Sequence, residues 1–378
     1  MNLKLFKKPF LGILILLVLG ACNRQAEDPG WVRGSPFPME RIKIGIIHPN
    51  EIDSDSLFDQ AQYLGTLEMQ RRIGLSDNQI IRKTNIFSGD PIASEGAIRD
   101  CIAEGANIII AMSFGYMEVC ERLAEEFPSV VFAHATGIRH NNHNFANYSI
   151  RLYQGRYLSG IVAGLRTETN RIGFVAARGL DNSEVTGGLN AFAMGVASVN
   201  PDALVFVEVT HSWYDPMGET NAANALIAMG CDVITAHANT SAAQVAAERA
   251  GVWAIGYNAD MSGEAPDAVI TSVVLNWGVL YTQLIRSIIS GTFMPRTHFW
   301  GFREGAVEIT PLNRYLAPPG AEEAVAAARE GLLRGEFMVF HGEFETNEGL
   351  MVGRPGENFT DDEILSEMNW YYRNIREL

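Results

Sequence analysis

Short β-branched apolar runs alternate with segments of helical periodicity along most of this chain, and this alternation limits its possible folds more than any other feature. Runs at 42–47, 107–112 and 130–134 are separated by helical patterns such as those at 57–72 and 117–127. Such short runs, hydrophobic on both faces, are typical of buried strands in a parallel sheet. The order strand–helix–strand therefore predicts an α/β protein built from βαβ units, with helices on both faces of each sheet.

A second series of the same kind follows the predicted helix at 153–166. Its strands are predicted at 171–175, 204–208, 232–235 and 252–256. Two similar series predict two lobes of the same architecture, and the strand at 270–274 with the helix at 277–289 predicts a return to the first lobe. Ligands bind such sheets at the carboxyl ends of the strands. Two lobes with those ends facing each other would form a clamp.

The first 22 residues have the layout of an export signal. Three lysines precede an apolar run at 10–19, no acidic residue occurs before position 22, and the run ends in Leu19-Gly20-Ala21-Cys22. That run is too short to span a bilayer, which needs about 20 residues, and its order is that of a secretory signal. The ending resembles a bacterial lipobox. We predict export and a lipid anchor on Cys22, facing the periplasm or the cell exterior; the alternatives are a buried helix or an ordinary signal with a chance Cys.

These patterns divide the chain into five parts. The predicted division is 1–21 as signal peptide with lipobox, 22–40 as lipidated Cys and flexible tether, 41–150 plus about 269–293 as lobe 1, 151–268 plus about 294–318 as lobe 2, and 319–378 as a C-terminal extension packing on the lobes. The tether is inferred from its proline and glycine content.

The charge argues against a nucleic-acid partner. The chain has 29 Lys and Arg against 44 Asp and Glu, and loss of the three signal lysines would take its net charge from −15 to −18. A general nucleic-acid binder needs a basic face. A hydrophobic content of 47% also excludes a disordered chain. We expect a monomer that binds no nucleic acid.

No motif points to catalysis, a cofactor or a metal. The sequence lacks GxGxxG after the first strand, GxxxxGK[ST], GxSxG and HExxH. His134, His140 and His143 are close in sequence, but no carboxylate or Cys completes a ligand set, so a polar loop is the better interpretation. The pattern predicts a protein that is not an enzyme, although catalytic residues scattered along the chain stay open as an alternative.

Three further cysteines, Cys101, Cys120 and Cys231, stand in apolar surroundings without a CxxC pair. Buried small hydrophobes explain them best. A Cys101–Cys120 disulfide stays open.

Aromatic residues recur just after predicted strands. Phe58 follows the first strand and its acidic loop, Ser113 and Phe114 follow the third strand, Trp213 follows the strand at 204–208, and Trp277 follows the strand at 270–274. Core packing would explain any one of them. Their repeated placement at the same edge favours a flat aromatic ligand held by stacking.

Polar residues accompany these aromatics. Asp260 lies just past a strand end, and its carboxylate would accept hydrogen bonds from ring N–H or amino groups; a turn or cap is the alternative role. His237 and Asn239 would orient a ligand, or Asn239 would cap the next helix. The predicted ligand-binding residues are Phe58, Ser113, Phe114, Trp213, His237, Asn239, Asp260 and Trp277.

Segments from about residue 42 to the C-terminus share a pattern with a known family. They lie at 153–160, 172–175, 198–201, 230–234 and 254–260, with 359–365 and 368–371 in the tail. In order and coverage they resemble the basic membrane protein family of bacterial lipoproteins, which are substrate-binding proteins of ABC importers. Purine-nucleoside receptors are its best-known members, and the tail resembles a branch thought to take purine bases. The resemblance implies the two-lobed, type I periplasmic-binding-protein fold, similar to the lac repressor body.

The resemblance also implies roles for individual residues. Phe58 matches the family's stacking Phe, Trp213 falls where the family has a second stacking aromatic, and Asp260, or else Asn258, matches its polar anchor. Nucleoside-binding relatives carry a Lys after the return strand where this chain has Leu275, which weakens the case for ribose. The implied function is capture of a purine base (adenine-like) or nucleoside for an ABC permease.

Other functions stay open at this point. They are a ligand-sensing regulatory lipoprotein, a binding protein for another small aromatic ligand or a sugar, and a surface-anchored hydrolase. A DNA-binding regulator with a similar body is disfavoured because the chain has an export signal and no helix-turn-helix.

Overall fold

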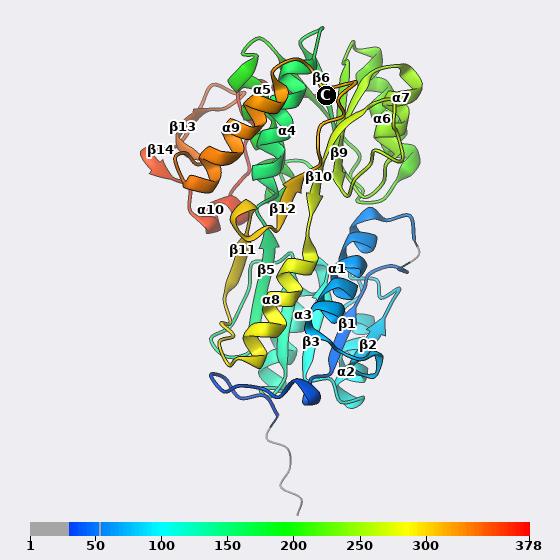
Figure 1. The fold of residues 1–378 in the computed structure, drawn as a ribbon, viewed down its shortest axis with the longest axis vertical. Helices are drawn as coiled ribbons and strands as arrows, with labels where there is room; N and C mark the ends of the chain where they lie inside the picture. Colours follow the sequence, from blue (N-terminus) through cyan, green and yellow to red (C-terminus); the bar gives the residue numbers. More distant parts are fainter. Residues whose placement is uncertain (1–29, 53) are drawn as a thin grey trace, which may run out of the picture.

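The computed structural model describes residues 30–52 and 54–378 (Figure 1). The predicted signal peptide and Cys22, the predicted site of lipid attachment, lie outside the described residues. The described part forms two lobes, one above the other in Figure 1, each with its own sheet. This is the predicted α/β architecture.

Lobe 1 contains a six-stranded sheet of order β11-β5-β4-β3-β1-β2 within the described residues, all of its neighbours parallel. Its strands are β1 (Ile44–Ile47), β2 (Ile80–Lys83), β3 (Ile108–Met112), β4 (Val131–Ala135), β5 (Phe145–Ile150) and β11 (Thr297–Trp300). Its helices are α1 (Leu57–Ile73), α2 (Pro91–Ala103), α3 (Met117–Glu126) and α8 (Trp277–Ile289).

Alternate residues of β3 explain the layering of this lobe. Ile108 and Ile110 belong to the same apolar cluster as residues of α1 and α8, while Ile109 belongs to the cluster formed with α2 and α3. Successive side chains of a strand point to opposite faces. A run of isoleucines therefore serves both faces, and helices cover each of them.

Lobe 2 contains a seven-stranded sheet of order β12-β10-β9-β8-β6-β7-β15 within the described residues. Its strands are β6 (Arg171–Ala176), β7 (Leu204–Val209), β8 (Val233–His237), β9 (Trp253–Asn258), β10 (Val269–Leu275), β12 (Val307–Ile309) and β15 (Ile375–Glu377). Its helices are α4 (Leu152–Arg166) and α5 (Ser183–Val199) on one face and α6 (Pro216–Ala228) and α7 (Ala242–Ala250) on the other.

The prediction for two late strands was wrong. The strand expected to return to lobe 1 is β10, which pairs with β9 and β12 in the lobe 2 sheet, whereas β11, expected in lobe 2, pairs with β5 in lobe 1. Helix α8 does return to lobe 1, where it packs against α1. The chain thus crosses between the lobes after β10 rather than before it. Strand periodicity carries no information about which sheet a strand joins.

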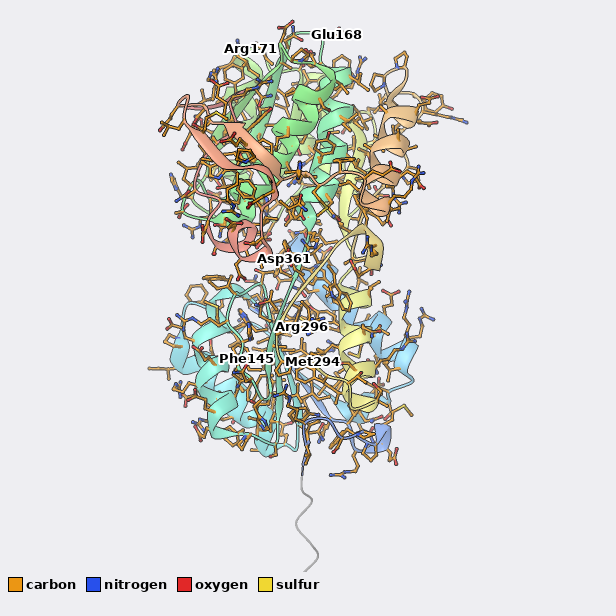
Figure 2. All side chains as sticks on the ribbon, turned by 90° about the vertical axis from the view of Figure 1, so that its left-hand side faces the viewer. Phe145, Glu168, Arg171, Met294, Arg296 and Asp361 are labelled. Atoms are coloured by element: carbon orange, nitrogen blue, oxygen red, sulfur yellow. The ribbon has the colours of Figure 1, made fainter. Side chains whose placement is uncertain are left out.

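The C-terminal extension packs mainly on lobe 2. Helix α9 (Ala321–Arg334) lies against α4, α10 (Asp361–Ser366) lies against α5, and β15 extends the sheet beside β7. A hairpin of β13 (His341–Glu345) and β14 (Met351–Asn358) stands between these helices in sequence. Figure 2 shows Asp361 at the level where the lobes meet, and its carboxylate pairs with Arg151 at 2.7 Å.

The cysteines are buried, as the sequence predicted, but the three histidines do not share one polar loop. Cys101, Cys120 and Cys231 are buried and free. His134 is buried on β4, with Nε2 2.7 Å from the carbonyl oxygen of Ser113, and His143 lies in the following loop. Among the described residues no group of His, Cys, Asp and Glu is arranged to hold a metal ion.

Candidate ligand-binding site

A cavity of about 380 Å³ lies between the two lobes, and we call it the interlobe cavity. Lobe 1 lines it with residues that follow β1, β2, β3 and β4 and with the first turn of α1. Lobe 2 lines it with residues at the ends of β6, β7, β8 and β9. Both walls are thus carboxyl edges of parallel sheets, where such folds bind ligands.

The structure brings six of the eight predicted residues to this cavity. They are Phe58, Ser113, Phe114, Trp213, His237 and Asn239. Asp260 and Trp277 do not line it.

Asp260 is an exposed turn residue, so its predicted placement in the cavity was wrong. Its Oδ1 accepts a hydrogen bond of 2.9 Å from the backbone N–H of Ser262. The alternative anchor, Asn258, is the last residue of β9, lines the cavity and is 1% exposed. Its φ of 73° is a left-handed conformation that Asn tolerates. The strand predicted at 252–256 runs on to Asn258, so the cavity-lining position falls on Asn258, and Asp260 lies in the exposed segment that follows.

Trp277 lies behind the cavity wall. It is 2% exposed, and its ring meets the ring of Phe58 edge-on, with centroids 6.0 Å apart and planes at 81°. A Cβ on Gly65 of α1 would lie 2.7 Å from Cβ of Trp277, so only glycine there allows α1 and α8 to approach this closely. Trp277 supports the back of Phe58 instead of touching the cavity.

The two stacking candidates come from opposite lobes. Phe58 is half-buried at the start of α1, and Trp213 is half-buried in the loop after β7. Their loops are connected across the cleft: the N–H of Leu57 donates to the carbonyl of Asn239 at 2.8 Å, and the N–H of Asn239 donates to the carbonyl of Trp213 at 2.9 Å. The structure therefore holds the lobes in contact on this side of the cavity.

Asp59 is a cavity residue that sequence reasoning missed. It is 1% exposed, and its Oδ2 accepts hydrogen bonds from Nδ2 of Asn50 at 2.8 Å and from Oγ of Ser56 at 2.6 Å. Its Oδ1 is buried and has no hydrogen-bond partner among the described residues. Burial raises the pKa of Asp59, against the lowering effect of those hydrogen bonds. One carboxylate oxygen thus remains available to a ligand.

Asn258 adds a second unsatisfied group. Both its Oδ1 and its Nδ2 are buried without a hydrogen-bond partner among the described residues. A buried polar group without a partner costs about 1–3 kcal/mol, so such groups in a cavity wall are candidates for contact with a ligand or an ordered water.

His237 is kept neutral. Burial, and then the nearby Arg156 cation, lower the pKa of His237 well below its ordinary value. Its Nε2 lies 2.8 Å from Oη of Tyr257, which also lines the cavity. Arg156 is fully buried beneath them, with its guanidinium carbon 4.0 Å from the Tyr257 ring centroid.

Two further charged residues line the cavity. The Glu184 side chain is 27% exposed, with Oε1 3.9 Å from Nε2 of His237, and burial raises the pKa of Glu184 to about 7. Arg178, in the loop after β6, forms no hydrogen bond or ion pair through its guanidinium within the described part of the chain. No sequence signal singled out either residue.

A smaller chamber of about 200 Å³ adjoins the interlobe cavity. The two share Phe114, Thr136, Asn182 and Glu184, and α10 of the C-terminal extension lines its far side. No helix in the described residues is long and apolar enough to cross a membrane.

Comparisons with known proteins agree with this geometry. The family described as PnrA-like ABC transporter substrate-binding proteins matches residues 42–324. The chain is 31% identical over 345 residues to a purine-binding protein of Brucella abortus, which covers 90% of this chain and 95% of that protein. It is 37% identical over 288 residues to a putative ABC transporter glucose-binding protein of Haloferax volcanii, which covers 75% of this chain and 69% of that protein.

A solved structure shares the fold. A solute-binding protein of an ABC transporter system from Aeropyrum pernix K1 superposes with a TM-score of 0.67 at 18% identity, over 79% of this chain and 92% of that one. At this identity the likeness concerns the fold alone, and it identifies the two lobes as a type I periplasmic binding-protein fold.

Proposed function

This chain belongs to the PnrA-like family of ABC transporter substrate-binding proteins, and from that premise we propose that it captures a purine nucleobase or nucleoside in the interlobe cavity and delivers it to a permease. Proteins of this family work outside the cytoplasm and release their ligand unchanged, so the chain is not an enzyme. The observation that carries the purine proposal is a cavity with aromatic side chains on both walls and unpartnered buried hydrogen-bonding groups between them.

Stacking supports a flat ligand. Phe58 reaches the cavity from lobe 1 and Trp213 from lobe 2, so a ring placed between them would contact both lobes. Base–aromatic stacking contributes about 1–3 kcal/mol per base. A ligand held this way stabilises the closed arrangement, since the open arrangement would lose one of the two stacking faces.

The polar groups fit the edge of a purine. The free Oδ1 of Asp59 accepts hydrogen bonds only, which suits a ring N–H or an amino group. The unpartnered amide of Asn258 can both donate and accept hydrogen bonds. It therefore suits a purine edge, which carries donors and acceptors side by side. The neutral state of His237 places no positive charge beside an uncharged base.

The relatives favour this proposal and also name its main rival. The Brucella relative is called a purine-binding protein, whereas the Haloferax relative is called a putative glucose-binding protein. A sugar is therefore the second candidate ligand. Ligand sensing without transport is a third possible role, and it would use the same ligand-binding site as import.

A calorimetric titration decides between the ligands. We expect the purified protein to bind at least one of adenine, guanine, hypoxanthine and their nucleosides, and not to bind glucose. Tight binding of glucose with none of the purines would refute the purine proposal. Uptake of the bound purine by cells with and without the gene then separates import from sensing.

We also propose the lipid anchor on Cys22. The supporting observation is the sequence Leu19-Gly20-Ala21-Cys22 after an apolar run. Cys22→Ala should move the protein from the membrane fraction to the soluble fraction, and mass spectrometry should find no diacylglyceryl group. Retention of the variant in the membrane would contradict the anchor.

A further inference from the structure

Arg178 is a charged lobe 2 residue that the proposed function leaves unused. Its side chain lines the interlobe cavity and is half-buried. The arginines of the described chain that do pair, such as Arg151 with Asp361 and Arg354 with Glu363, show clear hydrogen bonds. Arg178 has no such partner there, so its guanidinium donors remain available to a ligand.

The guanidinium presents its donors in a rigid, planar fork. Such a fork binds two neighbouring acceptors at once and has no acceptor of its own. Among purines, a 6-oxopurine has two adjacent acceptors on one edge, O6 and N7, and Arg binds this pair in a bidentate manner. Adenine has a donor, its amino group, beside N7. The fork therefore matches an oxopurine edge and meets one unfavourable group on adenine.

The opposite wall supplies the matching acceptor. Asp59, in lobe 1, keeps one buried carboxylate oxygen free. A 6-oxopurine carries a donor at N1–H beside O6, whereas N1 of adenine is an acceptor that a carboxylate repels. A free carboxylate on one wall and a free guanidinium on the other thus match the donor and acceptor pattern of hypoxanthine or guanine.

We infer that Arg178 is a specificity-determining residue and that the interlobe cavity selects 6-oxopurines over adenine. The inference rests on the proposed function, because it requires a purine in this cavity. It departs from the adenine-like base that the family resemblance implied, and the departure depends on a residue that no sequence pattern indicated.

Titration calorimetry with hypoxanthine, guanine and adenine tests the inference. We expect the oxopurines to bind the wild-type protein about tenfold or more tightly than adenine, the scale of one bidentate pair. Arg178→Lys keeps the charge and removes the fork, so it should lower oxopurine affinity by a similar factor and leave adenine affinity unchanged. Arg249→Lys, an exposed substitution on α7, is the matched control and should change nothing.

A modified ligand identifies the contact independently of the protein variant. 7-Deazahypoxanthine retains O6 but lacks the N7 acceptor. It should bind the wild-type protein more weakly than hypoxanthine, and this difference should be smaller in Arg178→Lys, because the lysine ammonium cannot hold both acceptors as the fork does.

The outcomes separate the two proposals. The inference is overturned if adenine binds as tightly as hypoxanthine, if Arg178→Lys weakens all three bases equally, or if the variant distinguishes hypoxanthine from its 7-deaza analogue as strongly as the wild type does. Failure of every purine and nucleoside to bind would instead refute the proposed function itself, and the inference with it.

Discussion

The two walls of the interlobe cavity are built differently, although both are carboxyl edges of parallel sheets. In lobe 1, Phe58 and Asp59 are neighbours in the first turn of α1, a helix of 17 residues. Ser56 caps this helix, and Trp277 packs behind Phe58. In lobe 2, Arg178 and Trp213 stand in loops after β6 and β7.

This difference indicates a division of work between the lobes. A side chain on a helix whose polar and apolar contacts are fixed is held more rigidly than one on a loop. We therefore expect Phe58 and Asp59 to keep their positions when a ligand binds, and Arg178 and Trp213 to adjust to it. Substitutions in lobe 1 should then lower affinity through lost contacts with a fixed geometry, while those in lobe 2 should also affect closure.

The largest effect is expected at Asp59. Asp59→Asn exchanges one carboxylate oxygen for a donor and removes the charge, so a ligand N–H loses a charge-assisted hydrogen bond. Such a bond contributes roughly 1.5–3 kcal/mol. Calorimetry should show this loss of binding free energy, and Asp260→Asn, in an exposed turn, should bind like wild type. Equal affinities of Asp59→Asn and wild type would remove Asp59 from the site.

Trp213 tests the lobe 2 wall. Trp213→Ala should weaken binding by about 1–3 kcal/mol, the scale of stacking on one base, and Trp213→Phe should restore most of it. Phe58→Ala is the corresponding change in lobe 1. If Phe58→Ala weakens binding and Trp213→Ala does not, the ligand stacks on lobe 1 alone and the two-wall arrangement is wrong.

The sequence was sufficient for the α/β architecture, and three of its four aromatic candidates line the interlobe cavity. The alternation of strands and helices predicted two α/β lobes because burial on both faces of a sheet leaves a clear periodicity. It could not assign β10 to lobe 2, because the residue pattern of a strand is the same whichever sheet the strand joins. Phe58 and Trp213 were found because aromatic residues recurred after strand ends.

The polar part of the site was largely beyond the sequence. Asp59 three residues after Ser56 looks like an ordinary helix start, and it does contribute to one. Only the structure shows that its second oxygen is buried and free. Asn258 and Asp260 differ by two positions, and only the structure shows that Asn258, with its left-handed backbone, is the one that lines the cavity. Arg178 belongs to no motif.

We expect the stability of the protein to depend on pH through Glu184. This residue belongs to the lobe 2 wall and lies beside the neutral His237. Its pKa is raised from the ordinary value of 4.5 to about 7, so the folded protein keeps its proton between those values while the unfolded chain loses it. The free energy of unfolding should therefore fall as pH rises from 4.5 to 7, by roughly 1 kcal/mol after allowing for partial exposure.

Urea denaturation across this pH range measures the effect. In Glu184→Gln this contribution should disappear, so the variant should gain stability relative to wild type as pH rises. Glu330→Gln, on the exposed surface of α9, is a suitable control. A wild type and variant with parallel pH profiles would show that Glu184 titrates normally.

The smallest expected effect tests whether the lobe 1 wall is held from behind. Trp277→Phe replaces the indole that meets Phe58 edge-on by a smaller ring. The edge-on contact contributes roughly 0.5–1 kcal/mol, so the binding free energy of a stacking ligand should fall by no more than that amount. Tyr148→Phe alters another ring beside Trp277, which does not line the cavity, and should leave affinity unchanged. Because both sites are buried, thermal stability is measured in parallel. A Trp277→Phe protein with lower stability but wild-type affinity would show that α1 alone sets the orientation of Phe58. The rigidity of the lobe 1 wall would then come from its helix and cap, because the aromatic packing behind it would have no effect on binding.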